Sequence, residues 1–496
     1  MQMENFAPIM FVGLVIVMLI GFPVAFSLAA LGLASGLFAI EMGWFPSAFM
    51  GNLPISIFSI LSNDLLLAIP FFTFMGTILE KCGLAEDMLD AMGQLFGPVR
   101  GGLGYSVIIV GFILGAITGT VAGQVIAMAL ISLPVMMRYG YNTRYATGVL
   151  AASGTITQLV PPSLVLVVLA DQLGRPVGDM YKGAWGPSLM QIAMFALYTY
   201  ALGLFKPEYV PGVPKEARTL DGWALWKKCL KGIIPSAVLI FTVLGSMGGL
   251  PFQDHAIATP TEAGAMGVVG ALVLAAMHKR LTKDLLWEAM HGTMRLTAMV
   301  AFILIGSRVF SLVFQGVDGA KWVEHLLSGL PGGQVGFLIV VNVFVFFLAF
   351  FLDFFEIAFI IIPMLAPVAE KMGIDLIWFG VLLCVNLQTS FMHPPFGFAL
   401  FYLRGIADTM FKEKRIASPI KTNDIYMGSI PWVLMQILLV VIVIFVPESV
   451  TAFLDKPEAV DLDTVVIEVP VDEDDAKAGE EPDPLRALQG PVEDKK

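Results

Sequence analysis

Long stretches without a charged residue recur along this chain of 496 residues, and two of them are residues 101–137 and 376–403. The hydrocarbon core of a bilayer is roughly 30 Å thick, so a helix that crosses it needs about 20 apolar residues. Hydrophobic residues make up 57% of the chain and charged residues only 14%, which is too apolar for a soluble protein of this size. The sequence therefore predicts an all-α polytopic membrane protein whose helices form a bundle.

The net charge says little about partners, because most of it lies in the C-terminal tail. Residues 451–496 hold 14 Asp and Glu against five Lys and Arg, which is −9 of the net charge of −11. We expect this acidic tail to be disordered and solvated. No basic stripe indicates nucleic-acid binding. The three cysteines and five histidines lack the spacing of a disulfide framework, metal cluster or catalytic motif, so we predict neither an enzyme nor a cofactor.

Two charge-poor segments have the length of a hairpin. Residues 101–137 carry GAITGTVAGQ at their centre, and residues 333–369 carry FLDFFE. Two complete spans need about 40 residues before a connection is counted. A re-entrant hairpin that turns near mid-membrane fits each segment better, while two full spans with a tight turn stay open for the first.

The segments after the hairpins are predicted to be helices broken by prolines, at 146–172 and 376–411. Each half of the chain then has the same order of helix, arm, helix, hairpin and broken helix, which indicates an internal duplication. We place the first repeat with a connecting span at 1–205 and an amphipathic cytoplasmic connector at 206–232. The second repeat with the last span follows at 233–450.

Lys and Arg mark the cytoplasmic loops. Arg138 and Arg144 follow the first hairpin, and the connector, HKRLTK and FKEKR are also basic, whereas the loop EKMGID after the second hairpin is not. The hairpins are then expected to open to opposite sides of the membrane. The fold class is therefore an inverted-repeat helical bundle with two re-entrant hairpins and two broken helices, and we expect roughly ten spans besides the hairpins.

Broken backbone at membrane depth indicates binding sites. Unpaired N–H and C=O groups in lipid cost several kcal/mol each, so a break must be packed in protein or line a cavity. In inverted-repeat transporters such carbonyls hold Na⁺, and half-helix N-termini bind a substrate carboxylate. Hydroxyl and carbonyl oxygens suit Na⁺ as hard ligands. In the first half the predicted ligands are Thr118, Gly119, Thr120, Gly154, Thr157 and Pro161. Small-residue packing at Gly115, Gly119 and Gly123 is the alternative.

The second tip and break supply a matching set. The predicted Na⁺ ligands there are Leu352, Asp353, Thr389, Met392 and Pro394. His393 lies among them and has two interpretations, a titrating proton carrier or a neutral imidazole hydrogen-bonded to the backbone.

Ionisable residues inside spans are candidates for substrate binding or coupling. Arg308, in VAFILIGSRVFSLVF, is expected to pair with Asp353, Glu356 or Glu262. Either a structural ion pair or a substrate carboxylate site explains such a residue. Glu262 follows Pro260 at the start of a span, where a carboxylate suits the helix N-terminus. The predicted substrate-binding and coupling residues are Arg308, Asp353, Glu262 and His393.

Several motifs resemble those of a known family. They are TPTEAGAMG, VPPS, FLDFFEIAFIIIP and NLQTSFMHPPFG. Over residues 5–450 the chain is similar to the large permease subunit of tripartite ATP-independent periplasmic (TRAP) transporters, of the DctM type. His393 stands where that family usually has Thr, and Thr389 with Ser390 stands where it has an Ile-Gly pair.

The resemblance implies an elevator-type transporter of the bacterial inner membrane. It implies two partners, a small four-helix membrane subunit and a soluble periplasmic binding protein. It also implies uptake of a small organic acid or carboxylate coupled to Na⁺, with no other cofactor. The alternative is a stand-alone Na⁺:anion symporter of the same superfamily.

Overall fold

The computed structural model describes residues 3, 6–118, 120–214, 222–251, 253, 255–395 and 397–454. Every regular element in this part of the chain is a helix, which confirms the all-α prediction. Residues 215–221 of the connector and the acidic tail from 455 onward lie outside the described residues. The disorder of the tail therefore stays a prediction.

The helices of the N-terminal half are α1 (Phe6–Ile20), α2 (Val24–Glu41), η2 (Ser47–Gly51), α3 (Asn52–Leu61), α4 (Asp64–Lys81), α5 (Leu84–Phe96), α6 (Gly102–Thr118), α7 (Val121–Arg138), α8 (Thr143–Thr155), η3 (Ile156–Gln158), α9 (Leu164–Leu173), α10 (Val177–Phe205) and η4 (Pro207–Tyr209). Those of the C-terminal half are α11 (Gly222–Ser246), α12 (Pro260–Met277), α13 (Lys283–Gly316), α14 (Gly319–Ser328), α15 (Gly333–Leu348), α16 (Phe354–Glu356), η6 (Ile357–Ile361), α17 (Ile362–Lys371), α18 (Leu376–Ser390), α19 (Phe398–Lys412), α20 (Thr422–Phe445) and α21 (Glu448–Thr451).

Seven of the described helices are long and apolar enough to cross a membrane, or up to nine if two bent pairs count as one span each. The sequence predicted roughly ten besides the hairpins, whereas the seven include α7, an arm of the first hairpin. The number is smaller because helices such as α1 and α18, with 15 residues each, are shorter than the about 20 residues of a typical span. Leu37, Val269 and Phe302 are large apolar side chains exposed on α2, α12 and α13, as expected where helices face lipid.

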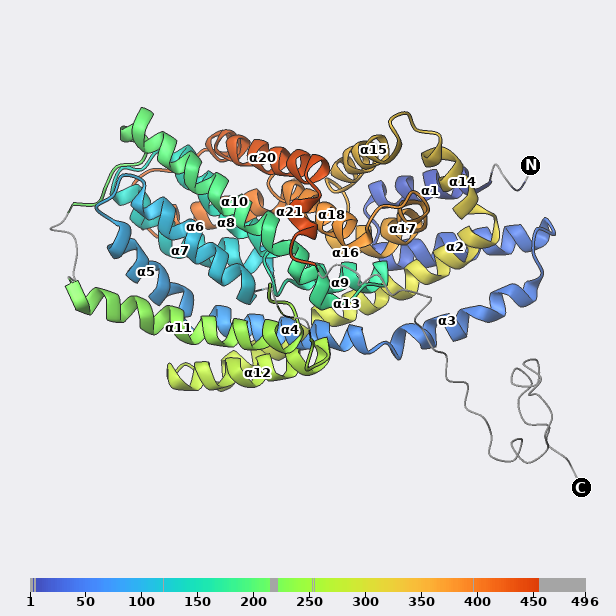
Figure 1. Ribbon diagram of the computed structural model, residues 1–496, viewed down its shortest axis with the longest axis horizontal. Coiled ribbons are helices and arrows are strands. Elements are labelled where there is room, and N and C mark those ends of the chain that lie inside the picture. The colour runs from blue at the N-terminus through green and yellow to red at the C-terminus, as the bar shows by residue number, and fades with distance from the viewer. Residues whose placement is uncertain are drawn as a thin grey trace, which may run out of the picture. The chain divides into compact units, whose positions relative to one another are not determined.

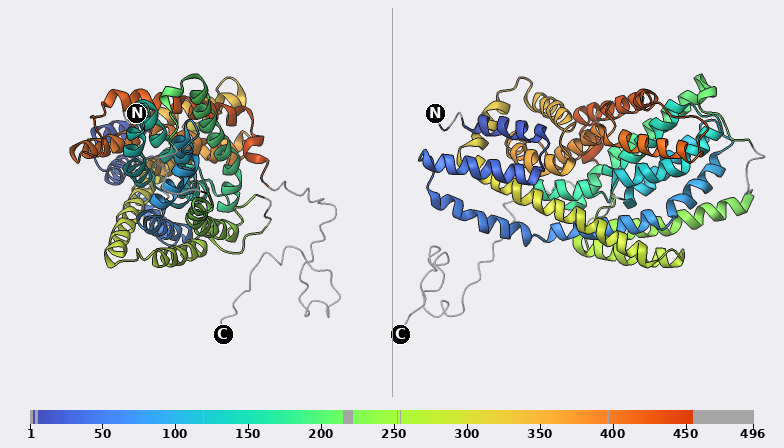
Figure 2. Two further views of the ribbon diagram at one scale, coloured as in Figure 1. Left: turned by 90° about the vertical axis from the view of Figure 1, so that its left-hand side faces the viewer. Right: turned by 180° about the vertical axis from the view of Figure 1, so that it is seen from behind.

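Helices of the two halves pack in a reciprocal pattern. α2 lies along α13, and α12 lies along α4 (Figure 1 and Figure 2). A Cβ added at Gly32 of α2 would lie 2.9 Å from the backbone of Phe310, and one at Gly264 of α12 would lie 2.9 Å from Cβ of Phe71. Small residues thus let both pairs approach closely. A duplication in which α2 corresponds to α12 and α4 to α13 would produce this pairing.

The predicted first hairpin coincides with an antiparallel helix pair, α6 and α7. The backbone N–H of Leu103 near the start of α6 donates to the hydroxyl of Tyr141, just beyond α7, at 3.2 Å. Between the arms, the buried amide of Gln124 donates to the Gly111 carbonyl at 2.6 Å and to the Ser153 carbonyl of α8 at 2.7 Å. One amide therefore joins both arms to the following helix. Re-entry of this pair into the bilayer stays a prediction.

The second hairpin is less regular than the first. After α15 and a turn, its second arm begins as α16, continues as the π-helical turn η6 and ends as α17. Nε2 of Gln334 at the start of α15 donates to the carbonyl of Met372, just beyond α17, at 2.8 Å. The base of the hairpin is thus closed. A π-helical turn widens the helix locally and is frequent at functional sites.

Candidate ion and substrate site

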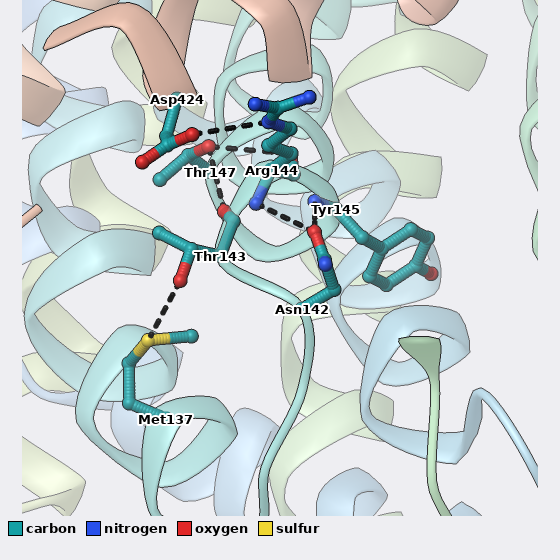
Figure 3. A network of polar contacts seen from close by, with 7 residues as sticks. All are labelled: Met137, Asn142, Thr143, Arg144, Tyr145, Thr147 and Asp424. Carbon is teal, nitrogen blue, oxygen red and sulfur yellow. Dashed lines mark hydrogen bonds and ion pairs between the residues drawn. The ribbon is translucent and has the colours of Figure 1, made fainter. Parts of the chain in front are cut away.

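A polar network fixes the start of the first broken helix (Figure 3). Oδ1 of Asn142 accepts a hydrogen bond from the backbone N–H of Arg144 at 2.9 Å and caps α8. Nε of Arg144 donates to Oδ1 of Asp424 at 3.0 Å, which ties α8 to α20 (Figure 3). The hydroxyl of Thr147 donates to the Thr143 carbonyl at 2.8 Å. Arg144, one of the basic residues that mark the cytoplasmic side in the sequence, therefore also has a structural partner.

The break between α8 and α9 packs against the first hairpin. A Cβ at Gly115 of α6 would lie 3.3 Å from Cα of Thr157, and a Cβ at Gly154 would collide with the side chain of Val125 on α7. Thr157 is buried, and Pro161 is buried beside it in a cis Pro161–Pro162 unit. The structure thus brings Gly154 and Thr157 to the hairpin. The small-residue contact considered as an alternative is present at Gly115, together with the hydroxyl of Thr157.

The first hairpin tip is described in part. Thr118 ends α6, but its side chain and the whole of Gly119 lie outside the described residues. Thr120 is the N-cap residue of α7, with φ −125° and ψ 128°, and its side chain makes no capping hydrogen bond. The helix that Thr120 begins therefore does not use its hydroxyl oxygen.

Buried hydroxyl groups at both breaks bond back to the carbonyl three residues earlier. The pairs are Thr155 with Ala152 at 3.0 Å, Thr157 with Gly154 at 3.1 Å, Thr389 with Asn386 at 2.7 Å and Ser390 with Leu387 at 2.6 Å. A hydroxyl that donates its proton keeps lone pairs with which to accept or to ligate. Thr155 already accepts from Nε2 of Gln436 on α20 at 3.1 Å. The two breaks thus share one local pattern of oxygens.

Protein donors occupy some carbonyl groups of the first break. The Gln158 carbonyl accepts from the thiol of Cys384 at 3.1 Å and from the hydroxyl of Ser163. The Leu159 carbonyl accepts from the hydroxyl of Ser188 at 3.3 Å. These two carbonyls are therefore less available to an ion than a carbonyl without a protein donor.

The acids at the second tip form a helix cap. Asp353 precedes α16, and its backbone N–H donates to Oε2 of Glu356 at 2.9 Å in a capping box. Leu352 and Phe354, on either side of Asp353, are buried. Both acids therefore have a local structural role at the tip, whatever they bind.

His393 joins the second break to the second hairpin. Its ring stacks on Phe350 with centroids 4.6 Å apart and meets Phe346 edge-on at 5.3 Å. Nδ1 of His393 is buried, and in the part of the chain that the structure describes it has no hydrogen-bond partner. Nδ1 thus lacks the backbone hydrogen bond expected for a neutral imidazole, although the imidazole interacts with the main chain of Pro394. Of the neighbouring predicted ligands, Met392 is fully buried and Pro394 is half-buried.

The predicted ion pair of Arg308 is wrong. Among the described residues, neither Asp353 nor Glu356 nor Glu262 forms an ion pair with its guanidinium. Glu262 instead accepts hydrogen bonds from the backbone N–H of Thr259 at 2.8 Å and from its hydroxyl at 3.0 Å, which closes a capping box at the start of α12. Glu262 and Glu356 thus have partners within their own capping boxes. Arg308 lines a cavity of about 320 Å³.

Sequence reasoning missed the buried amides that hold the broken helices. Gln191 of α10 and Gln388 of α18 donate to each other's Oε1, both at 3.0 Å. Nδ2 of Asn386 on α18 donates to the Asn342 carbonyl of α15 at 2.8 Å. An amide inside an apolar span needs a partner, because burying it unpaired costs free energy. The Asn and Gln residues within the charge-free runs could therefore have predicted hydrogen bonds between helices.

Comparison with known proteins places the chain in one family. The family model of the tripartite ATP-independent periplasmic transporter, DctM component, matches residues 11–449. The C4-dicarboxylate TRAP transporter large permease protein DctM of Rhodobacter capsulatus is 28% identical over 458 residues, which cover 89% of this chain and 97% of that protein. The 2,3-diketo-L-gulonate TRAP transporter large permease protein YiaN of Escherichia coli is 26% identical over 388 residues, covering 78% and 85%.

One further relative and one solved structure extend the comparison. The isethionate TRAP transporter permease protein DctMQ of Oleidesulfovibrio alaskensis is 24% identical over 409 residues, which cover 82% of this chain and 61% of that protein. The crystal structure of the Alcanivorax borkumensis YdaH transporter superposes with a TM-score of 0.55 at 14% identity, covering 85% of this chain and 96% of that one. This last likeness concerns the fold alone. The protein is thus a multi-pass inner-membrane permease, and the chain belongs to the DctM component family of tripartite ATP-independent periplasmic transporters.

Proposed function

We propose that this chain is the transport subunit of a secondary active TRAP transporter, which takes up a small organic acid together with Na⁺. The observation that carries the proposal is that each hairpin meets a broken helix. Gly115 lies against Thr157 in the first half, and Phe350 stacks on His393 in the second. Broken helices that meet hairpins within an apolar bundle are typical of ion and substrate sites in transporters.

Na⁺ is the ion that the chemistry of the two meeting points favours. Buried Thr and Ser hydroxyls and main-chain carbonyls gather there, and these are hard neutral oxygens. The proposed ligands of the first site are Thr118, Gly119, Thr120, Gly154, Thr157 and Pro161. Those of the second site are Leu352, Asp353, Thr389, Met392 and Pro394.

The proposed mechanism is an elevator motion of the hairpins and broken helices against the long crossed helices. The reciprocal packing of α2 with α13 and of α12 with α4 supports a fixed frame built from both halves. Neither ion site is complete unless its hairpin and its broken helix meet, so Na⁺ binding would hold each hairpin against its broken helix. Ion binding thereby couples to substrate binding.

The proposed partners follow from membership in the family. They are a small four-helix membrane subunit and a periplasmic protein that delivers the acid. Three of the relatives are named for C4-dicarboxylates, 2,3-diketo-L-gulonate and isethionate, which are all small organic anions. These names support this class of substrate. A stand-alone Na⁺:anion symporter is the second proposal, and it would transport without a binding protein.

Uptake into proteoliposomes tests the proposal. The purified chain with its small subunit receives a panel of binding proteins loaded with different acids, under a Na⁺, K⁺ or pH gradient. We expect uptake only with a loaded binding protein and only under the Na⁺ gradient. Uptake without any binding protein would favour the symporter, and uptake that follows a pH gradient in Na⁺-free buffer would contradict Na⁺ coupling.

A further inference from the structure

A polar cavity beside the second hairpin is not part of the two proposed ion sites. Its volume is about 320 Å³, and residues at the α3–α4 junction, α9, α13, η6 and α17 line it. On α13 the lining residues are Leu304, Ser307, Arg308, Ser311 and Gln315, which share one helical face by their spacing. The hydroxyl of Ser307 donates to the carbonyl of Phe359 in η6. The π-helical turn is therefore fixed against the wall of this cavity.

Arg308 is the one charged residue in the sequence from 296 to 316. An arginine at the centre of a span costs roughly 2.5 kcal/mol or more unless it reaches a partner or a water-filled cavity. In the described part of the chain it has no carboxylate partner, and its side chain is exposed into the cavity. A guanidinium placed in this way is suited to a bidentate carboxylate.

Asp171 of α9 lines the same cavity but does not pair with Arg308. Its Oδ1 accepts from Nδ2 of Asn63 at 2.8 Å, and its Oδ2 accepts from Nε2 of Gln172 at 2.7 Å. Two amides thus hold the carboxylate in place. The lining residues include one cation, Arg308, and one anion, Asp171. If Arg308 binds the first carboxylate of a dicarboxylate, the second carboxylate has no cation to pair with and is repelled by Asp171.

We infer that this cavity is the substrate site and that it selects a monocarboxylate bearing hydroxyl groups over a dicarboxylate. Arg308 takes the carboxylate, and Ser311 and Gln315 are placed to hydrogen-bond to hydroxyl groups of the acid. Asp171 excludes a second carboxylate by repulsion, because like charges brought together at a binding site cost free energy. The inference rests on the proposed uptake of an organic acid and names the class of acid.

Thermal unfolding of the full chain in detergent, titrated with gluconate or succinate at constant ionic strength, tests this selection. We expect gluconate to stabilise the wild-type protein with a half-saturating concentration about tenfold below that of succinate. Arg308→Gln is expected to raise the gluconate value about tenfold, and Arg308→Lys less, because lysine keeps the charge but not the fork. Arg295→Gln is the matched control, since Arg295 is exposed on α13 and does not line the cavity. Succinate that binds as tightly as gluconate, or Arg308→Gln with wild-type gluconate affinity, would overturn the inference.

Asp171→Asn tests the repulsion without touching Arg308. It is expected to lower the half-saturating concentration of succinate about fivefold and to change that of gluconate less than about twofold. An unchanged preference in Asp171→Asn would overturn the role of this carboxylate even if Arg308→Gln does not fold.

The titrations are repeated with K⁺ in place of Na⁺ to separate this inference from the proposed function. If gluconate binding depends on Arg308 but uptake does not depend on Na⁺, only the proposed Na⁺ coupling is contradicted. If uptake is driven by Na⁺ but Arg308→Gln does not change gluconate binding, only the proposed substrate cavity is contradicted.

Discussion

The two broken helices share a local pattern of hydrogen bonds but differ in their enclosure. At both breaks Thr or Ser hydroxyls donate to carbonyls three residues earlier. Residues 156–163 of the first break are all buried, whereas at the second break His393 and Pro394 are half-buried and Pro395 is exposed. The first hairpin contacts its break through a glycine, Gly115. The second hairpin contacts its break through Phe346 and Phe350, and it also contains the helix-capping residue Asp353. The first break is therefore sensitive to volume, and the second to charge and access.

The largest expected effect concerns the orientation of the two hairpins. A cysteine introduced on one side of the membrane is labelled either from that side or not at all. Arg138 ends α7 and Lys371 ends α17, so these exposed residues mark matching ends of the hairpins. An impermeant maleimide is expected to label Arg138→Cys only from the cytoplasm and Lys371→Cys only from the periplasm. The wild-type protein is the control, because Cys82, Cys229 and Cys384 are buried. Labelling of both variants from one face would break the inverted comparison.

A single methyl group should damage the first break. In Gly154→Ala the new Cβ collides with Val125, and overpacking of this kind costs about 1–3 kcal/mol. We expect a lower unfolding temperature and loss of Na⁺-driven uptake. Gly405→Ala is the control, since Gly405 of α19 has open space around it and a helix gains roughly 0.5–1 kcal/mol from this exchange. Wild-type stability and uptake in Gly154→Ala would contradict the close packing of the break on the hairpin.

Charge rather than volume should matter at the second tip. Asn caps a helix about as well as Asp does, so Asp353→Asn is expected to unfold at nearly the wild-type temperature. If Asp353 ligates Na⁺, loss of its charge should raise the half-saturating Na⁺ concentration for uptake more than about tenfold. An interaction with a charged group contributes about 1.5–3 kcal/mol, and 1.4 kcal/mol corresponds to about tenfold in affinity. Asp375→Asn removes a carboxylate that caps α18 by accepting from the Trp378 N–H at 2.8 Å, and it should leave Na⁺ affinity unchanged. Equal effects of the two variants would reduce Asp353 to a helix cap.

The sequence predicted the elements of both halves better than the contacts between them. Charge-free runs and Pro-Pro pairs placed α6–α7 and the two breaks, because apolar length and helix-breaking residues act locally. The stacking of His393 on Phe350, the Gln191–Gln388 pair and the isolation of Arg308 depend on which helices come together. A local sequence pattern does not determine which helices pack together, so it could not identify the neighbours of Arg308, and the predicted ion pair was wrong.

The hydroxyls of the two breaks should differ in strength as Na⁺ ligands. Thr157→Val keeps the shape of the side chain and removes an oxygen, and we expect it to raise the half-saturating Na⁺ concentration about tenfold, or ~1.4 kcal/mol. Thr389→Val should raise it only about threefold, because the charged Asp353 of the proposed second site stays in place when this fully buried hydroxyl is lost. Thr409→Val is the control, since its hydroxyl also donates to a helix carbonyl, Gly405 at 2.9 Å, but is exposed on α19. A larger shift in Thr389→Val than in Thr157→Val would reverse the comparison.

His393→Phe should have the smallest effect, and it decides between ion and proton coupling at the second break. Phenylalanine keeps the aromatic contact with Phe350 and Phe346 and removes Nδ1, a buried atom without a hydrogen-bond partner among the described residues. Because an unpaired buried polar atom costs about 1–3 kcal/mol, its loss should leave stability unchanged or raise it. Na⁺-driven uptake should stay within about twofold of wild type, since a change below 0.4 kcal/mol in the barrier has no larger effect. His393→Ala, which loses the stacking as well, separates packing from titration. If His393 carries the coupling proton, wild-type uptake will follow a pH gradient in Na⁺-free buffer and His393→Phe will abolish it, and both proposed Na⁺ sites would then have to be given up.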